Sequence, residues 1–137
     1  MPPEGKRPCR RPGYGVHCAP VPATILVVDD EPSLRLLCRI NLELEGYEVV
    51  EAGTLAEARA AVASHDLDLV LLDVHLGHES ARPLLEELRS RTPHVPVALV
   101  TGSAELHPAG EASADATIVK PYTIEGLLET VRDLITG

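Results

Sequence analysis

The stretch that decides the fold is residues 24–32, with the sequence TILVVDDEP. Five apolar or β-branched residues are followed at once by two aspartates, a glutamate and a proline. A short apolar run of this kind is typical of a strand that is buried on both faces of a sheet. Proline is suited to the first turn of a helix. The stretch therefore predicts a buried strand that ends in carboxylates and leads directly into a helix.

Similar short runs recur along the chain and alternate with segments of helical periodicity. The other predicted strands are Tyr47–Ala52, Leu67–Leu72, Val97–Val100 and Thr117–Val119, and the first of these alternates like an edge strand. The predicted helices carry apolar faces made by Leu36, Leu37, Ile40 and Leu44; by Leu55, Ala58 and Val62; by Leu84, Leu85 and Leu88; and by Ile124, Leu127, Leu128, Val131, Leu134 and Ile135. Thr54 and Thr123 are expected N-caps, and Gly46 is expected to close the first helix.

This order of elements predicts the fold class. Five strands that alternate with helices favour a parallel sheet with right-handed crossovers. We therefore expect an α/β domain built on a doubly wound, five-stranded parallel sheet with helices on both faces.

Length and composition exclude several classes of protein. The chain has 137 residues, enough for one domain and a tail. It has 21 acidic and 12 basic residues, a formal net charge of -9, and neither Phe nor Trp. A nucleic-acid-binding surface needs a basic face, and base stacking needs aromatic rings. We therefore expect no direct contact with nucleic acid.

Charge is unevenly distributed along the chain. Residues 1–23 hold four basic residues and one acidic residue, a balance of +3, together with six of the twelve prolines. Residues 24–137 hold 8 basic and 20 acidic residues, a balance of -12. We interpret 1–23 as a disordered leader and 24–137 as the folded domain. Because the chain has no signal-like or membrane-spanning apolar run and no disulfide framework, we expect a cytoplasmic protein without membrane insertion.

Polar residues interrupt the predicted strands at their carboxyl ends. Asp29 and Asp30 follow the first strand, Asp73 follows the third, Thr101 the fourth and Lys120 the fifth. In open α/β sheets the ligand crevice lies outside these ends. We therefore expect three carboxylates, a hydroxyl and an ammonium to converge there.

Three clustered carboxylates need a cation, because two of them about 4 Å apart repel by roughly 4 kcal/mol at an effective dielectric constant of 20. An oxygen-only set made by Asp29, Asp30 and Asp73 suits Mg²⁺. An aspartate can act as a nucleophile toward phosphorus and form an acyl phosphate. Lys120 is one of only two lysines beside ten arginines. Its place at a strand end favours a requirement for a compact ammonium.

Four segments resemble the motifs of the response regulator receiver domain, which has the CheY-like, flavodoxin-like fold. They are Val27–Pro32, Leu71–Asp73, Val100–Gly102 and Val119–Tyr122. They occur in the family's order and at close to its spacing, and the resemblance spans residues 24–136. It implies a sheet with strand order 2-1-3-4-5.

The resemblance also implies a role for each site residue. Asp73 would be the phosphoacceptor, supplied by a histidine kinase or a histidine phosphotransfer protein. Asp30 and Asp73 would bind Mg²⁺ directly together with the backbone carbonyl of His75, and Asp29 would act largely through water. Lys120 would pair with the phosphoryl oxygens, and the hydroxyl of residue 101 would reach the phosphoryl group. Phosphorylation would then change a protein-docking surface.

Several positions depart from the family pattern. Leu76-Gly77 replaces the usual Met-Pro or Leu-Pro, and Ala81 stands where a glycine is usual. Thr117 occupies the position of the aromatic switch residue. Pro108 and Gly110 fall where the fourth helix belongs, so we expect that helix to be short or irregular. These departures predict intact phosphorylation chemistry with an atypical output face.

Three functions remain open from the sequence. The first is a single-domain response regulator of a two-component phosphorelay, a monomer or weak dimer that acts on an unknown downstream protein. Its only chemistry would be self-phosphotransfer and autodephosphorylation, so it would not be an enzyme. The second is a degenerate receiver that acts as a scaffold without phosphorylation. The third is a Mg²⁺-dependent phosphohydrolase with an aspartyl nucleophile, although such enzymes typically carry a second Asp at the position of His75.

Overall fold

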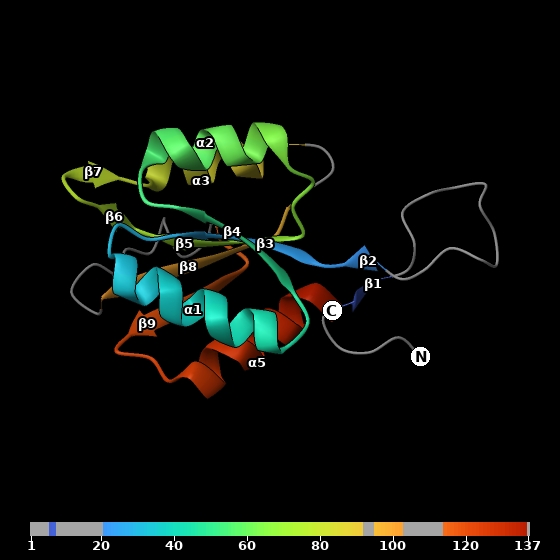
Figure 1. The fold of residues 1–137 in the computed structure, drawn as a ribbon. Helices are drawn as coiled ribbons and strands as arrows, with labels where there is room; N and C mark the ends of the chain where they lie inside the picture. Colours follow the sequence, from blue (N-terminus) through green and yellow to red (C-terminus); the bar gives the residue numbers. More distant parts are fainter. Residues whose placement is uncertain (1–5, 8–20, 92–94, 103–113, 137) are drawn as a thin grey trace, which may run out of the picture.

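A five-stranded parallel sheet runs through the centre of the molecule (Figure 1). The computed structural model describes residues 6–7, 21–91, 95–102 and 114–136. The strands of the sheet are β3 (Thr24–Val28), β4 (Glu48–Ala52), β5 (Leu69–Asp73), β8 (Val97–Gly102) and β9 (Ala116–Lys120). Their spatial order is β4-β3-β5-β8-β9. This confirms the predicted α/β class and the order 2-1-3-4-5.

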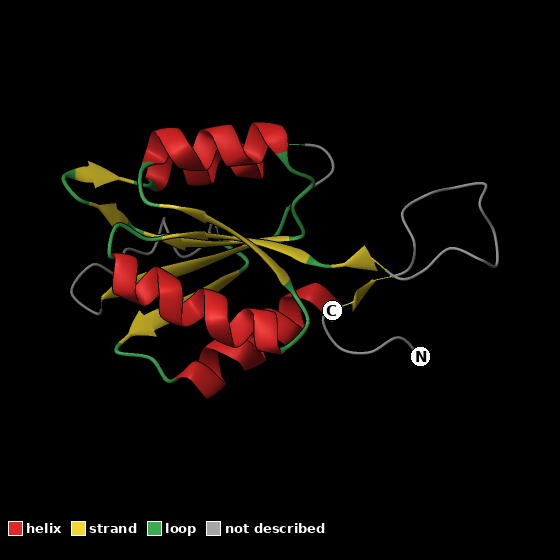
Figure 2. Cartoon of the chain, in the orientation of Figure 1, coloured by secondary structure: helices red, strands yellow, loops and turns green. Residues whose placement is uncertain are grey.

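Helices cover both faces of the sheet. In Figures 1 and 2, α2 (Leu55–Ser64) and α3 (Arg82–Arg89) lie on one side, and α1 (Pro32–Leu44) and α5 (Ile124–Thr136) lie on the other. Alternate residues of β3 point to opposite sides, as a strand requires. Leu26 therefore packs under α2 and α3, and Ile25 packs in the second core with α1 and α5.

The apolar face predicted for α1 does not face the sheet. Leu44 is 78% exposed, and Leu36, Leu37 and Ile40 are exposed with it, whereas Leu42 on the other side is completely buried. Cys38 is the second buried residue of this helix. The helix has two apolar stripes, and the periodicity alone did not distinguish the stripe that the sheet covers from the one that it leaves to solvent.

The other helices agree more closely with the sequence pattern. The Thr54 hydroxyl accepts a hydrogen bond from the backbone N–H of Glu57 at 3.1 Å, and the Thr123 hydroxyl accepts one from Gly126 at 3.0 Å, so both predicted N-caps are confirmed. Gly46 follows α1 with a φ of 97°, a conformation that favours glycine. In α2, Leu55 and Ala58 are buried as predicted, but the third buried residue is Ala61 instead of Val62, which is only partly buried against the core.

Two short antiparallel pairs complete the described elements. β1 (Lys6–Arg7) pairs with β2 (Val21–Pro22), next to a completely buried Ala23. β6 (His75–Leu76) pairs with β7 (Glu79–Ser80) after β5. Most of the predicted leader and residues 103–113, where we predicted a short fourth helix, lie outside the described residues. Within the described part of the chain, no helix has the length and apolar character needed to cross a bilayer.

Candidate functional site

The carboxyl ends of four strands place the predicted site residues at one edge of the sheet. β3 leads into Asp29, β5 ends at Asp73, and β9 ends at Lys120. In the parallel register Asp73 lies opposite Val100, and the next residue, Thr101, opposite Val119. The convergence expected from the sequence is therefore present.

Three carboxylates meet at the centre of this site. Asp29, Asp30 and Asp73 each offer an oxygen, and the three oxygens lie within 4.8 Å of one another. Asp29 and Asp73 are buried, whereas Asp30 is exposed. The cluster is thus accessible to solvent on the side of Asp30.

Backbone N–H groups orient each of these carboxylates. Oδ1 of Asp29 accepts from Glu31 at 2.9 Å, and Oδ1 of Asp73 accepts from His75 at 3.2 Å. Oδ2 of Asp30 accepts from Gly77 at 2.8 Å. Hydrogen bonds of this kind fix the rotamer of a carboxylate.

Gly77, which departs from the family motif, contributes directly to the site. Its φ is 64°, in the left-handed region, at the turn between β6 and β7. This conformation accompanies the N–H donation to Asp30, which lies 47 positions away in the sequence. The sequence signal for this turn is the glycine itself, because a residue with positive φ in a turn is usually glycine.

Lys120 forms the ion pair of the site. Its Nζ lies 2.8 Å from Oδ2 of Asp73, whose side chain is 6% exposed. Burial lowers the pKa of Lys120, but the hydrogen bond and charge of Asp73, with the charges of Asp29 and Asp30, outweigh it and raise the pKa above its ordinary value. The ammonium therefore stays charged at neutral pH.

Thr101 is buried beside this pair. Its hydroxyl donates a hydrogen bond to the neighbouring carbonyl of Gly102 at 3.1 Å. Thr101 lies at the end of β8, between the strands that carry Asp73 and Lys120. The residue is thus in the predicted place, with its hydroxyl engaged by the backbone.

Electrostatics favour a cation in this cluster. Burial, together with the charges of Asp73 and Asp30, raises the pKa of the Asp29 carboxyl above its ordinary value. The hydrogen bond from Glu31 and the charge of Lys120 lower this pKa but do not cancel the rise. One ammonium does not neutralise three carboxylates. A donor set of carboxylate oxygens alone suits a hard divalent cation such as Mg²⁺, so the residues present fit the predicted metal.

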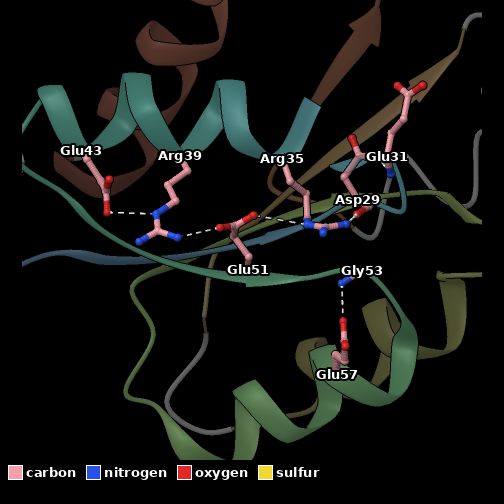
Figure 3. Close-up of polar contacts among 8 residues, drawn as sticks. All are labelled: Asp29, Glu31, Arg35, Arg39, Glu43, Glu51, Gly53 and Glu57. Carbon is pink, nitrogen blue, oxygen red and sulfur yellow. Dashed lines mark hydrogen bonds and ion pairs between the residues drawn. The ribbon is translucent and has the colours of Figure 1, made fainter. Parts of the chain in front are cut away.

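Two contacts made by helix α1 near the site were not predicted from the sequence. Tyr122, which follows Lys120 by two residues, places its hydroxyl 3.4 Å from Sγ of Cys38 on α1. Burial raises the pKa of both groups above their ordinary values. Arg35 on α1 donates from Nη1 to the carbonyl of Asp29 at 2.7 Å (Figure 3). The contact of Tyr122 with Cys38 joins residues 84 positions apart, whereas the contact of Arg35 with Asp29 spans only six positions, across the turn from β3 to α1.

Comparisons with known proteins agree with this geometry. The family model described as the response regulator receiver domain matches residues 25–132. A CheY-like receiver domain from Methanospirillum hungatei superposes with a TM-score of 0.76 at 30% identity, covering 83% of this chain and 94% of that one. The TrrA response regulator from Thermotoga maritima, solved in complex with Mg²⁺–BeF, has a TM-score of 0.75 at 34% identity, with 82% and 98% covered.

Curated relatives include transcriptional regulators. TcrX of Mycobacterium tuberculosis, a probable transcriptional regulatory protein, is 38% identical over 117 residues, which is 83% of this chain and 50% of TcrX. RpaA of Synechocystis, a DNA-binding transcriptional regulator, is 31% identical, with 81% of this chain and 48% of RpaA covered. The chain spans about half the length of these relatives.

These relatives bear on two expectations from the sequence. The exclusion of nucleic acid is not supported, because the relatives include a DNA-binding regulator. The family assignment is confirmed, because its model covers most of the chain and the site residues converge as the motifs predicted. The chain therefore belongs to the response regulator receiver domain family of two-component systems.

Proposed function

We propose that this protein is a phosphorylation-dependent switch in which Asp73 accepts a phosphoryl group from a phosphohistidine donor. Receiver domains interact with histidine kinases and with downstream effectors. The observation that carries the proposal is the 2.8 Å contact between Nζ of Lys120 and the buried carboxylate of Asp73, inside the cluster of three aspartates. A histidine kinase or a histidine phosphotransfer protein would supply the phosphoryl group.

The proposed transfer is a single displacement at phosphorus. A carboxylate oxygen of Asp73 forms a bond to phosphorus while the bond from phosphorus to the donor nitrogen breaks, and the donor imidazole keeps that electron pair. Lys120 is already in place to pair with the oxygens of the transferring group. Thr101 lies one strand away from Asp73 and would turn its hydroxyl from Gly102 toward the new phosphoryl group.

Receiver domains bind Mg²⁺ at this acidic pocket. Here Asp29, Asp30, Asp73 and the backbone carbonyl of His75 would hold the ion, which would offset negative charge on the phosphoryl oxygens. The backbone of the chain itself orients the three carboxylates. Glu31, His75 and Gly77 donate backbone N–H groups that keep the three carboxylates pointing at one another.

The output would be a change in a protein-docking surface, by a route that differs from the family's usual one. Thr117, which stands in place of an aromatic switch residue, lies on β9 opposite Leu99 of β8. A threonine has no ring to exchange between two positions. Phosphorylation that leaves the amide shifts of residues 102–118 unchanged would contradict any switch through this segment.

The proposal is tested by mass spectrometry of the intact protein after incubation with acetyl phosphate and Mg²⁺. We expect a slowly hydrolysed phosphate adduct on the wild type and on Glu31→Gln, the matched control, whose exposed side chain lies next to the cluster. We expect no adduct on Asp73→Asn. Absence of an adduct on the wild type would instead support a phosphorylation-independent scaffold. Rapid turnover of small phosphate esters would support a phosphohydrolase.

A further inference from the structure

Arg35 joins helix α1 to the backbone that carries the metal-binding carboxylates (Figure 3). Its Nη1 donates to the carbonyl oxygen of Asp29 at 2.7 Å. On the other side of the same residue, the N–H of Asp29 donates to the carbonyl of Ala52, the last residue of β4, at 3.0 Å. The sheet therefore holds the N–H of Asp29, and the side chain of Arg35 holds its carbonyl.

A carboxylate on β4 orients this arginine. Oε1 of Glu51 lies 3.3 Å from Nε of Arg35, and the two side chains are only 26% and 20% exposed. The other oxygen of Glu51 lies 2.9 Å from Nη1 of Arg39, which also pairs with Glu43. In Figure 3 the two arginines flank Glu51, but only Arg35 extends to Asp29.

Gly53 leaves the space that the guanidinium occupies. A Cβ atom added at this position would lie 2.8 Å from Nη1 of Arg35, closer than Cβ contacts in proteins allow. The backbone of Gly53 is not in the left-handed region, so the conformation by itself does not require glycine. Close approach of Arg35 is the physical reason for a glycine here, and a methyl group would displace a flexible side chain rather than the backbone.

We propose that Arg35 is a positioning residue for the metal site. By fixing the carbonyl of Asp29, it holds the turn from β3 to α1, and with it the side chains of Asp29 and Asp30, in the geometry that binds the cation. Glu51 orients the guanidinium and Gly53 makes room for it. The proposal rests on the proposed function of this site as a Mg²⁺-dependent phosphoacceptor.

Position and charge predict opposite effects of neutralising this arginine. A guanidinium near three carboxylates repels a divalent cation, so electrostatics alone predict tighter Mg²⁺ binding in Arg35→Gln. Loss of a group that positions metal ligands predicts weaker binding. Gly53→Ala tests the same point without any change of charge.

The first experiment measures the Mg²⁺ dissociation constant by calorimetric titration. We expect Arg35→Gln and Gly53→Ala each to weaken binding by about tenfold. Arg39→Gln is the matched control: it removes the other arginine of Glu51 without touching Asp29, and we expect its dissociation constant to stay within about twofold of the wild type, as for a surface ion pair. Equal or tighter binding by both test variants would overturn the proposal.

The second experiment uses metal-free protein and so does not depend on the function of the site. The hydrogen bond from Arg35 should be visible in the ¹³C shift of the Asp29 carbonyl. We expect this resonance to move in Arg35→Gln and in Gly53→Ala, to move back in part in Arg35→Lys, and to stay in place in Arg39→Gln. An unmoved resonance in Gly53→Ala, the variant that disturbs the fold least, would refute the positioning role. If the ¹³C shift of the Asp29 carbonyl responds to these variants as expected but the wild type binds no Mg²⁺, the proposed metal site would be refuted and the contact from Arg35 supported.

Discussion

The ammonium of Lys120 at the end of β9 lies 2.8 Å from the carboxylate of Asp73 at the end of β5, so this ion pair passes over the end of the intervening strand β8. The two residues are 47 positions apart in the sequence. The contact joins the second half of the sheet to the strand that carries the proposed phosphoacceptor, and it places the ammonium against a buried carboxylate of the aspartate cluster.

Removing the lysine should destabilise the metal-free protein. Lys120→Ala leaves the buried carboxylate of Asp73 without its charged partner, and we expect a loss of about 1–3 kcal/mol in the free energy of unfolding. Urea denaturation measures this loss. Arg59→Ala serves as the control, because its pair with Glu87 lies between exposed side chains. That variant should lose less than about 1 kcal/mol.

Magnesium should reduce the defect of Lys120→Ala. A divalent cation in the carboxylate cluster compensates part of the charge that the lysine no longer offsets, and binding to the folded state alone stabilises it by mass action. The difference in unfolding free energy between Lys120→Ala and the wild type should therefore shrink as Mg²⁺ is added. A difference that grows with Mg²⁺ would show that the lysine and the cation do not share this charge.

The stability of the metal-free protein should rise when Asp29 is neutralised. Burial raises the pKa of Asp29 in the folded state above the ordinary 3.8, so the folded protein holds this proton more tightly than the unfolded chain. The ionised carboxylate therefore costs stability above the raised pKa, and the cost disappears as the pH falls toward 3.8. We expect Asp29→Asn to gain about 1–4 kcal/mol at pH 7, the range of a like-charge contact between bulk water and an effective dielectric constant of 20.

Urea titrations of Asp29→Asn at pH 7 and at pH 4 check this sign. The advantage of the variant should be present at pH 7 and largely gone at pH 4. Glu129→Gln, which removes an exposed carboxylate from α5, controls for net charge and should show no comparable change. A variant that is less stable than the wild type at pH 7 without metal would contradict the role of burial and repulsion at this position.

The two apolar stripes of α1 should respond very differently to the same substitution. Leu42→Ala creates a cavity in the core and should cost about 2–5 kcal/mol. Leu36→Ala removes a side chain that is 53% exposed and should change stability by no more than about 0.5 kcal/mol. Thermal and urea unfolding of the two variants provide the comparison. Similar losses in both would mean that the exposed stripe is covered in solution.

Cys38 should react slowly with thiol reagents in the folded protein. It is buried, and burial raises its pKa, so both access and the thiolate fraction are low. In a Cys9→Ser, Cys18→Ser background, we expect its reaction with a disulfide reagent at pH 8 to be at least about a hundredfold slower than in urea, where the thiol is exposed. Equal rates in both conditions would show that α1 leaves the sheet readily.

The sequence alone was sufficient to predict the α/β class and the residues of the acidic cluster, and its resemblance to the receiver family implied the strand order. Each buried strand of a parallel sheet reads as a short apolar run, and its polar carboxyl end marks the edge where ligands bind. The sequence therefore groups five residues at this edge of the sheet: Asp29, Asp30, Asp73, Thr101 and Lys120. Their motif context also led to the family, which the comparison over residues 25–132 confirmed.

The tertiary structure decided which groups hold that cluster in place. Periodicity showed that α1 has apolar residues, but only the packing of the helix on the sheet selected Cys38 and Leu42 for burial and left Leu36 exposed. Likewise, Glu51 pairs with the guanidinium that contacts Asp29 only because α1 and β4 lie side by side. Local sequence encodes propensity and polarity, whereas such contacts depend on how separate elements are placed by the whole core.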